Sequence, residues 1–261
     1  MDYVIVCVVA LTASVLTLFS GFGLGTVLMP AFALFFPVPV AVAATALVHL
    51  SNNIFKIALV GRKADWGVVI RFALPAAGAA IVGAALLNLF VGMTPVAVYE
   101  LGGQLHQVTA VKLIIGVVII VFAFIELLPF FEKLAFDRKY LPLGGLISGF
   151  FGGLSGNQGA LRSAFLINAG LEKEAYVGTG TVAAVIVDVA RLSVYGLGFY
   201  STHFAGISNN TGGLIIAATI AAFLGAFIGT RLMKKITMRT IQLIVGIMLI
   251  LVGLGMAGGL F

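Results

Sequence analysis

Arg162 follows a polar segment that interrupts an otherwise apolar part of the chain. The segment contains Ser155, Asn157 and Gln158, with glycines at 156 and 159. Glycines let a backbone approach a solute closely, the N–H groups at a helix start favour negative charge, and a guanidinium binds oxyanions through paired hydrogen bonds. These four polar residues are therefore predicted to bind an anion. The alternative is that Arg162 donates to carbonyls exposed by the interrupted helix.

A second set of polar residues forms a stripe on a helix predicted over 40–60. The spacing of Thr45, His49, Asn53 and Lys56 is i, i+4, i+8 and i+11, which places them on one helical face. We expect Asn53 and Lys56 to bind the anion and His49 to be a candidate for proton coupling. Two alternatives stay open: Lys56 reaching the membrane surface, and His49 only hydrogen-bonding in the core.

A matching stripe lies on the helix predicted over 176–197. Thr181, Asp188, Arg191 and Tyr195 are spaced at i, i+7, i+10 and i+14. Arg191 is expected to bind the anion, while Asp188 orients it or carries a coupled proton. Because the two are three residues apart on a helix, a purely structural ion pair is the alternative.

The first half of the chain has a similar glycine-rich break without a cation. Gly23 and Gly25 are expected to bring their backbone close to the solute. No spacing of histidines and cysteines predicts a metal site, and the single cysteine, Cys7, lies in an apolar run. No nucleophile and base constellation is present, so the prediction is a non-enzyme without a cofactor.

Composition determines where these residues must function. The 261-residue chain is 61% hydrophobic and 9% charged, with a mean hydropathy of +1.19. Such a chain is predicted to be an all-α, polytopic integral membrane protein. Its net charge of +6 arises largely from short basic loops, a pattern that encodes orientation in a membrane and does not indicate nucleic-acid binding.

Hydrophobic runs divide the chain into two similar halves, 1–130 and 140–261. A polar loop is expected over 92–107. The predicted segments are 3–20, 26–36, 40–60, 67–91 and 108–128, then 141–154, 163–171, 176–197, 214–232 and 241–260.

An internal repeat is suggested by the recurrence of Ser20-Gly21-Phe22 as Ser148-Gly149-Phe150. A shift of 135 residues also aligns Asn53 with Asp188 and Lys56 with Arg191. Five segments in each half would invert the second repeat relative to the first, with short broken helices at the centre. Whether segments 26–36 and 163–171 span the membrane or are re-entrant stays open; re-entrant segments are expected to leave four crossings in each half.

The glycine-rich motifs resemble those of the TauE/SafE family of sulfite exporters and their relatives. The resemblance rests on residues 20–25 with Pro30, on 149–159, and on the stretches 41–45 and 178–181. The chain departs from the family pattern at 163–164, where Ser-Ala replaces a frequent proline.

The resemblance implies transport of a sulfur-containing or organic anion, such as sulfite, thiosulfate, a sulfonate or sulfoacetate, across a bacterial cytoplasmic membrane. We expect a multi-pass transporter of this anion class, working by alternating access, with the site between the two inverted repeats. An anion channel or the membrane subunit of a larger complex is the alternative. The expected partners are a small anion and lipid, while a coupling proton or cation and a homo-oligomer stay open, as do the direction and the anion itself.

Overall fold

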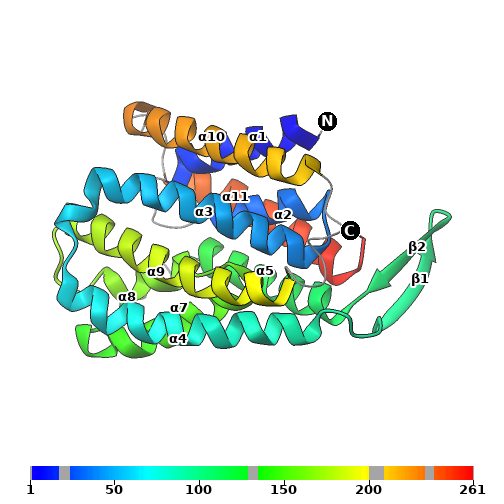
Figure 1. Ribbon diagram of the computed structural model, residues 1–261, viewed down its shortest axis with the longest axis horizontal. Coiled ribbons are helices and arrows are strands. Elements are labelled where there is room, and N and C mark those ends of the chain that lie inside the picture. The colour runs from blue at the N-terminus through cyan, green and yellow to red at the C-terminus, as the bar shows by residue number, and fades with distance from the viewer. Residues whose placement is uncertain (1, 18–23, 129–134, 200–208, 233–237, 261) are drawn as a thin grey trace.

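The structure is a computed structural model that describes residues 2–17, 24–128, 135–199, 209–232 and 238–260. Within them, five α-helices precede residues 129–134 and five follow (Figure 1). The α-helices are α1 (Asp2–Thr17), α2 (Leu24–Ala33), α3 (Val38–Val60), α4 (Trp66–Phe90), α5 (Ala110–Leu127), α7 (Leu141–Ser155), α8 (Gly159–Leu166), α9 (Lys173–Phe199), α10 (Asn209–Leu232) and α11 (Met238–Ala257). The short 3-10 helices are η1 (Gly61–Lys63) and η2 (Arg138–Tyr140), and the strands are β1 (Ala97–Leu101) and β2 (Gln104–Val108).

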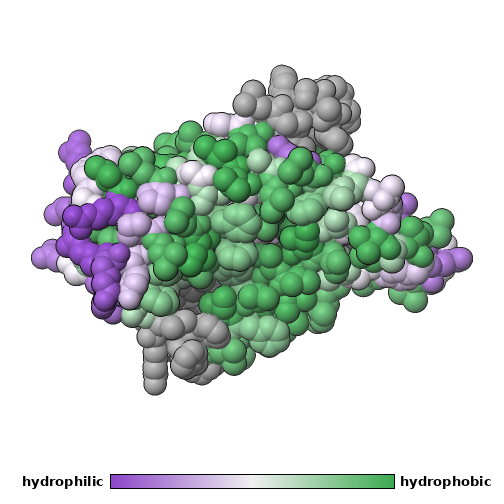
Figure 2. All heavy atoms as spheres, turned by 90° about the horizontal axis from the view of Figure 1, so that it is seen from below, coloured by the Kyte–Doolittle hydropathy of each residue, from purple (hydrophilic) through white to green (hydrophobic). Residues whose placement is uncertain are grey.

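The helical content and the apolar surface confirm an all-α membrane protein. Among the described residues, three helices are long and apolar enough to cross a membrane: Val38–Ala58, Trp66–Phe90 and Lys173–Gly196. Large apolar side chains such as Leu74 and Leu89 on α4 are exposed. Figure 2 shows a broad hydrophobic surface next to a hydrophilic end, as expected of a protein surrounded by lipid.

The hydrophilic end is formed by three connections. Arg138 lies 3.7 Å from Asp65, and Lys63 lies 3.5 Å from Glu174. The loops before α4, α7 and α9 therefore meet at one end of the molecule, which we call the basic end. Figure 1 shows the hairpin and both chain termini at the opposite end.

Helix α8 turns back alongside α7 toward the basic end. The Phe136 amide, just before α7, donates to the Ala164 carbonyl at 3.2 Å, and the Phe136 ring stacks on Phe165 with centroids 4.3 Å apart. Both ends of the α7–α8 pair therefore lie at the basic end, which makes the pair re-entrant. Helix α8 begins at Gly159, not at the predicted Ser163.

Helices α1 and α2 have the corresponding arrangement at the other end. Because α3 ends at Val60 near the basic end, its start at Val38 and the nearby end of α2 lie at the opposite end, where α1 begins (Figure 1). Residues 18–23, between α1 and α2, lie outside the described residues. Among the described residues, five α-helices lie on either side of 129–134. The short ones turn back, which leaves three longer helices on each side, whereas four crossings in each half were expected for re-entrant segments.

The segment predicted as a polar loop over 92–107 is largely a β-hairpin. Strands β1 and β2 pair antiparallel, with Leu101 opposite Gln104. The two residues between them, Gly102 and Gly103, have φ of 61° and 77°, the left-handed conformation that a tight two-residue hairpin turn requires and glycine provides. The hairpin projects from the helices at the end opposite the basic end (Figure 1).

Close backbone packing holds α7 against α4. Gly145, Gly149 and Gly153 are spaced four residues apart on α7, so they share one face. Each lies directly against α4 backbone, at Phe72, Ala76 and Ala80 respectively, with no room for a side chain. Such glycine faces are how helices approach closely in membranes. The packing positions the end of α7, where the candidate site begins.

The Gly149→Ala substitution is expected to destabilise the protein by about 1–3 kcal/mol, because the new methyl group would overlap the Ala76 backbone and force α4 and α7 apart. The measurement is thermal unfolding of the purified protein in detergent. Gly78→Ala on α4 is the matched control, since a methyl group there meets nothing within 4 Å. Equal unfolding temperatures for the two variants would contradict the packing described here.

Candidate anion site

A three-residue break separates α7 from α8 inside the protein. Gly156 ends α7 with a φ of 85°, which favours glycine. The backbone of the break is held by side chains: the Ser148 hydroxyl donates to the Gln158 carbonyl at 2.9 Å, and Ser155 Oγ accepts from the Asn157 backbone amide at 3.4 Å. Ser155, Asn157 and Gln158 are all buried, so the predicted binding segment is an interior one.

Two side chains from α9 bind the carbonyls at the end of α7. The Arg191 Nη1 donates to the Gly152 carbonyl at 3.2 Å, and the Tyr195 hydroxyl donates to the Gly153 carbonyl. Carbonyls near a helix end have few intrahelical donors; the Gly152 carbonyl also accepts from the Gly156 amide at 3.0 Å, so the Arg191 bond is its second. The alternative role considered for Arg162 was to donate to such carbonyls; for these two, the donors are Arg191 and Tyr195.

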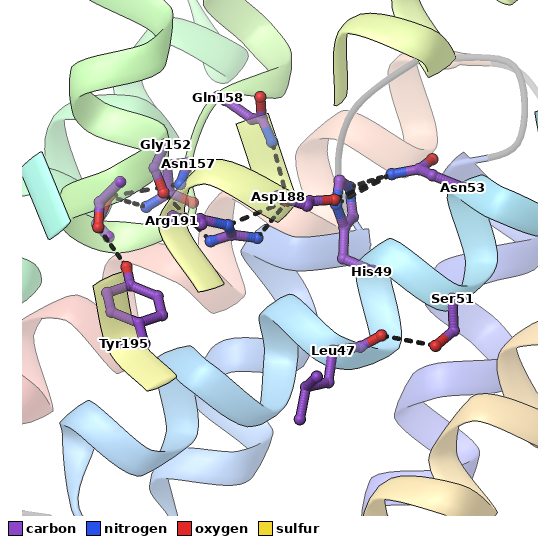
Figure 3. Close-up of polar contacts among 12 residues, drawn as sticks. Leu47, His49, Ser51, Asn53, Gly152, Asn157, Gln158, Asp188, Arg191 and Tyr195 are labelled. Atoms are coloured by element: carbon purple, nitrogen blue, oxygen red, sulfur yellow. Dashed lines mark hydrogen bonds and ion pairs between the residues drawn. The ribbon is translucent and has the colours of Figure 1, made fainter. Parts of the chain in front are cut away.

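Asp188 is the centre of the polar network (Figure 3). Its Oδ1 accepts from Arg191 Nε at 3.0 Å and Nη2 at 2.7 Å, and from Gln158 Nε2 at 3.3 Å. Its Oδ2 lies 2.6 Å from His49 Nδ1 and accepts from Asn53 Nδ2 at 3.5 Å. One carboxylate therefore joins α9, α3 and the α7–α8 break. The predicted ion pair between Asp188 and Arg191 is confirmed as a contact.

Gly25, from the glycine-rich segment of the first half, lies at the same place. A side-chain carbon at Gly25, in the first turn of α2, would lie 3.4 Å from the Gly156 carbonyl oxygen, 3.7 Å from the His49 ring and 3.9 Å from Thr45. Gly25 is therefore next to the network, while its predicted approach to the solute stays a prediction. Gly23 lies outside the described residues.

Two further cations border the network. Arg162, the fourth residue of α8, is 5% exposed, and Lys56 on α3 is 9% exposed. Arg162 is close enough to interact electrostatically with both Lys56 and Asp188. Lys56 is buried, which disagrees with the alternative in which its side chain reaches the membrane surface. The structure thus brings together the predicted residues that it describes, while their role in binding stays a prediction.

One buried polar residue on α3 and one contact of the network were not predicted from the sequence. Asn52 is fully buried, and neither atom of its side-chain amide has a hydrogen-bond partner in the described part of the chain; the same holds for the Thr45 hydroxyl. Unpaired buried polar atoms are costly, so each needs an explanation such as a water or ion that pairs with it. The contact between His49 and Asp188, 139 positions apart, had no local sequence signal.

The donor set of this region suits an anion better than a metal ion. Across the residues that the structure describes, no group of three or more histidine, cysteine or acidic side chains lies close enough to hold a metal. Guanidinium, ammonium and amide N–H groups surround the network, and these bind oxyanions.

Comparison with known proteins identifies the family. The family model "Sulfite exporter TauE/SafE" matches residues 6–256. The chain belongs to the TauE/SafE family. Nothing among curated proteins or solved structures matched the chain. TauE/SafE proteins are membrane transporters rather than enzymes, and the family indicates a sulfur-containing anion as cargo, which agrees with the cationic, buried character of the network.

Removing Asp188 alone should destabilise this TauE/SafE protein strongly. Asp188→Ala leaves the fully buried Arg191 guanidinium without its carboxylate, which is expected to cost about 3–5 kcal/mol. The double variant Asp188→Ala/Arg191→Met removes both charges and should recover much of the loss. Unfolding in detergent measures the stability of each variant. If the double variant lost more stability than the two single variants lose together, this account would be contradicted.

Proposed function

We propose that the protein moves a small sulfur-containing or organic anion, of the sulfite, thiosulfate, sulfonate or sulfoacetate class, across the bacterial cytoplasmic membrane by alternating access. The observation that carries this proposal is the burial of Arg162, Arg191 and Lys56 around a break between helices, deep in an apolar helical protein. Ionised groups in such a place are costly, and they are retained where they serve a solute.

The proposed anion site is the surface formed by the α7–α8 break, the start of α8 and the facing side of α3. Asn157 and Gln158 supply amide groups next to Arg162, while Lys56 and Asn53 approach from α3. The first turn of α8 adds backbone N–H groups with the positive end of the helix dipole. An oxyanion held here would interact with side-chain cations from three helices, namely Lys56 of α3, Arg162 of α8 and, in the adjoining network, Arg191 of α9.

The proposed architecture is a pair of inverted repeats, 1–130 and 140–261, with the site at their interface. Helix packing supports this architecture. If α1 to α5 correspond to α7 to α11 in order, then α3 packs on its counterpart α9, and α5 on its counterpart α11. The contact of α4 with α7 likewise has its equivalent in the contact of α10 with α1. Asn53 and Asp188, which a shift of 135 residues aligns, contact each other, as equivalent residues near a two-fold axis would. Inverted repeats meeting at broken helices are a transporter architecture.

Burial of the charged residues supports a carrier over a channel. Asp188 and Arg191 are inaccessible to solvent and Arg162 nearly so, which is the occlusion expected of one state in an alternating-access cycle. In an inside-negative cell, an anion leaves downhill by about 2.3 kcal/mol per charge per 100 mV. The membrane potential alone therefore favours export of such a solute.

Replacing Arg162 should weaken anion binding by at least about tenfold, because a charge-assisted hydrogen bond contributes roughly 1.5–3 kcal/mol. The measurement is a thermal-shift screen of the purified protein against sulfite, thiosulfate, sulfate, sulfonates and small carboxylates. A ligand that binds the folded state raises its unfolding temperature by mass action. Arg162→Gln should abolish the shift seen with the wild-type protein.

Arg71→Gln is the matched control, since Arg71 is an exposed arginine on α4, away from the network. This variant should show the full shift. A wild-type protein that responds to no anion in the screen would contradict the proposed function, and an unchanged response in Arg162→Gln would remove this residue from the site.

A further inference from the structure

The Arg191 guanidinium is already bound to one carboxylate in this structure. Its Nε and Nη2 both donate to Asp188 Oδ1, at 3.0 and 2.7 Å, and its Nη1 donates to the Gly152 carbonyl. This is the same edge of the guanidinium that would bind an oxyanion in the paired geometry. A solute anion and an ionised Asp188 therefore compete for Arg191.

We propose that the protein resolves this competition by taking up one proton on the His49–Asp188 pair for each anion that Arg191 binds. This inference deepens the proposed function and rests on it. Protonation removes the negative charge from Asp188, and the anion replaces that charge beside Arg191. The anion and the proton are thus bound together, so the transporter moves them in the same direction.

His49 provides the route for the proton. Its side chain keeps 13% of its surface accessible, while Asp188 and Arg191 have none. A proton from solvent binds the imidazole at Nε2, and the Nδ1 proton then passes to Asp188 Oδ2 across the 2.6 Å contact. The products are a neutral carboxylic acid and a neutral imidazole protonated at Nε2. One proton enters, and no other bond is made or broken.

The charges around Asp188 set the sign of the effect. His49 faces it from α3, Arg162 from α8, and Arg191 and Tyr195 from its own helix; Lys56, also on α3, interacts with Arg162. Asp188 is the acid of this group, and the other ionisable members are basic apart from the Tyr195 phenol. Neutralising Asp188 therefore leaves an excess of positive charge, which favours anion binding.

The neighbouring helices do not offset this excess. Helices α2 and α7 carry no charged residue. The charged residue within α4 is Arg71, which is exposed, and the one within α10 is Arg231, in its last turn. Anion affinity should accordingly rise as pH falls, because the protonated network is the one that binds.

The test counts protons taken up when thiosulfate binds to the purified full-length chain in detergent. Thiosulfate is the probe because it does not titrate near neutral pH. In weakly buffered solution with a pH indicator, the wild-type protein should take up close to one proton per thiosulfate bound. By reciprocal linkage, its Kd should fall about tenfold for each unit of decreasing pH over the range of full uptake.

Two variants sharpen the result. Asp188→Asn imitates the protonated acid, so it should bind thiosulfate with no proton uptake and with an affinity that does not depend on pH. Asp137→Asn is the matched control, because Asp137 is exposed and pairs with Lys139 outside the network. It should keep the wild-type proton count.

The outcomes separate this inference from the proposed function. Thiosulfate binding with no proton uptake by the wild-type protein overturns the proton proposal and leaves anion transport intact. Failure of thiosulfate and of every other anion in the screen overturns the proposed function itself. If Asp188→Asn does not fold, the proton count of the wild-type protein alone decides. A folded Asp188→Asn that no longer binds thiosulfate overturns the exchange, since it would show that the charged carboxylate is needed.

Discussion

A single buried carboxylate organises the centre of this protein. Asp188 is inaccessible to solvent and has side-chain partners from α3, from α9 and from the α7–α8 break. A buried ion is tolerated only when its charge is balanced and its lone pairs are satisfied. Each partner of Asp188 therefore depends on the others being in place, and the carboxylate links parts of the chain that are far apart in sequence.

The same constraint explains how an irregular segment can exist inside an apolar protein. A break in a membrane helix exposes carbonyls that lipid cannot satisfy, so it must be enclosed by protein. Here Arg191 and Tyr195 bind the carbonyls of Gly152 and Gly153, and the glycine face of α7 packs against α4. The arginine that balances Asp188 is also the one that stabilises the helix end. Any movement that separates α9 from α7 must supply new partners for both groups.

Much of this organisation could be predicted from the sequence, because it follows from composition and local periodicity. The apolar runs located the helices, and the polar stripes on α3 and α9 located most of the network. What could not be predicted depends on contacts between distant segments, such as His49 with Asp188, or the return of α8 along α7 through Phe136 and Phe165. The hairpin, in contrast, could have been predicted. Gly102-Gly103 lies between two stretches in which apolar and polar residues alternate, which is a recognisable turn signal, but the polar character of the segment led to the prediction of a loop.

The two re-entrant helix pairs bring Gly25 and Gly156 together. The α7–α8 pair enters from the basic end and the α1–α2 pair from the opposite end, yet Gly25 and Gly156 are neighbours. Each short helix is eight to ten residues long, or roughly 12–15 Å at 1.5 Å per residue, which is about half of a bilayer core. Two such pairs entering from opposite ends meet near the middle. In the transport cycle proposed above, each pair would separate the solute from one side of the membrane, and displacement of one pair would open the site to that side only.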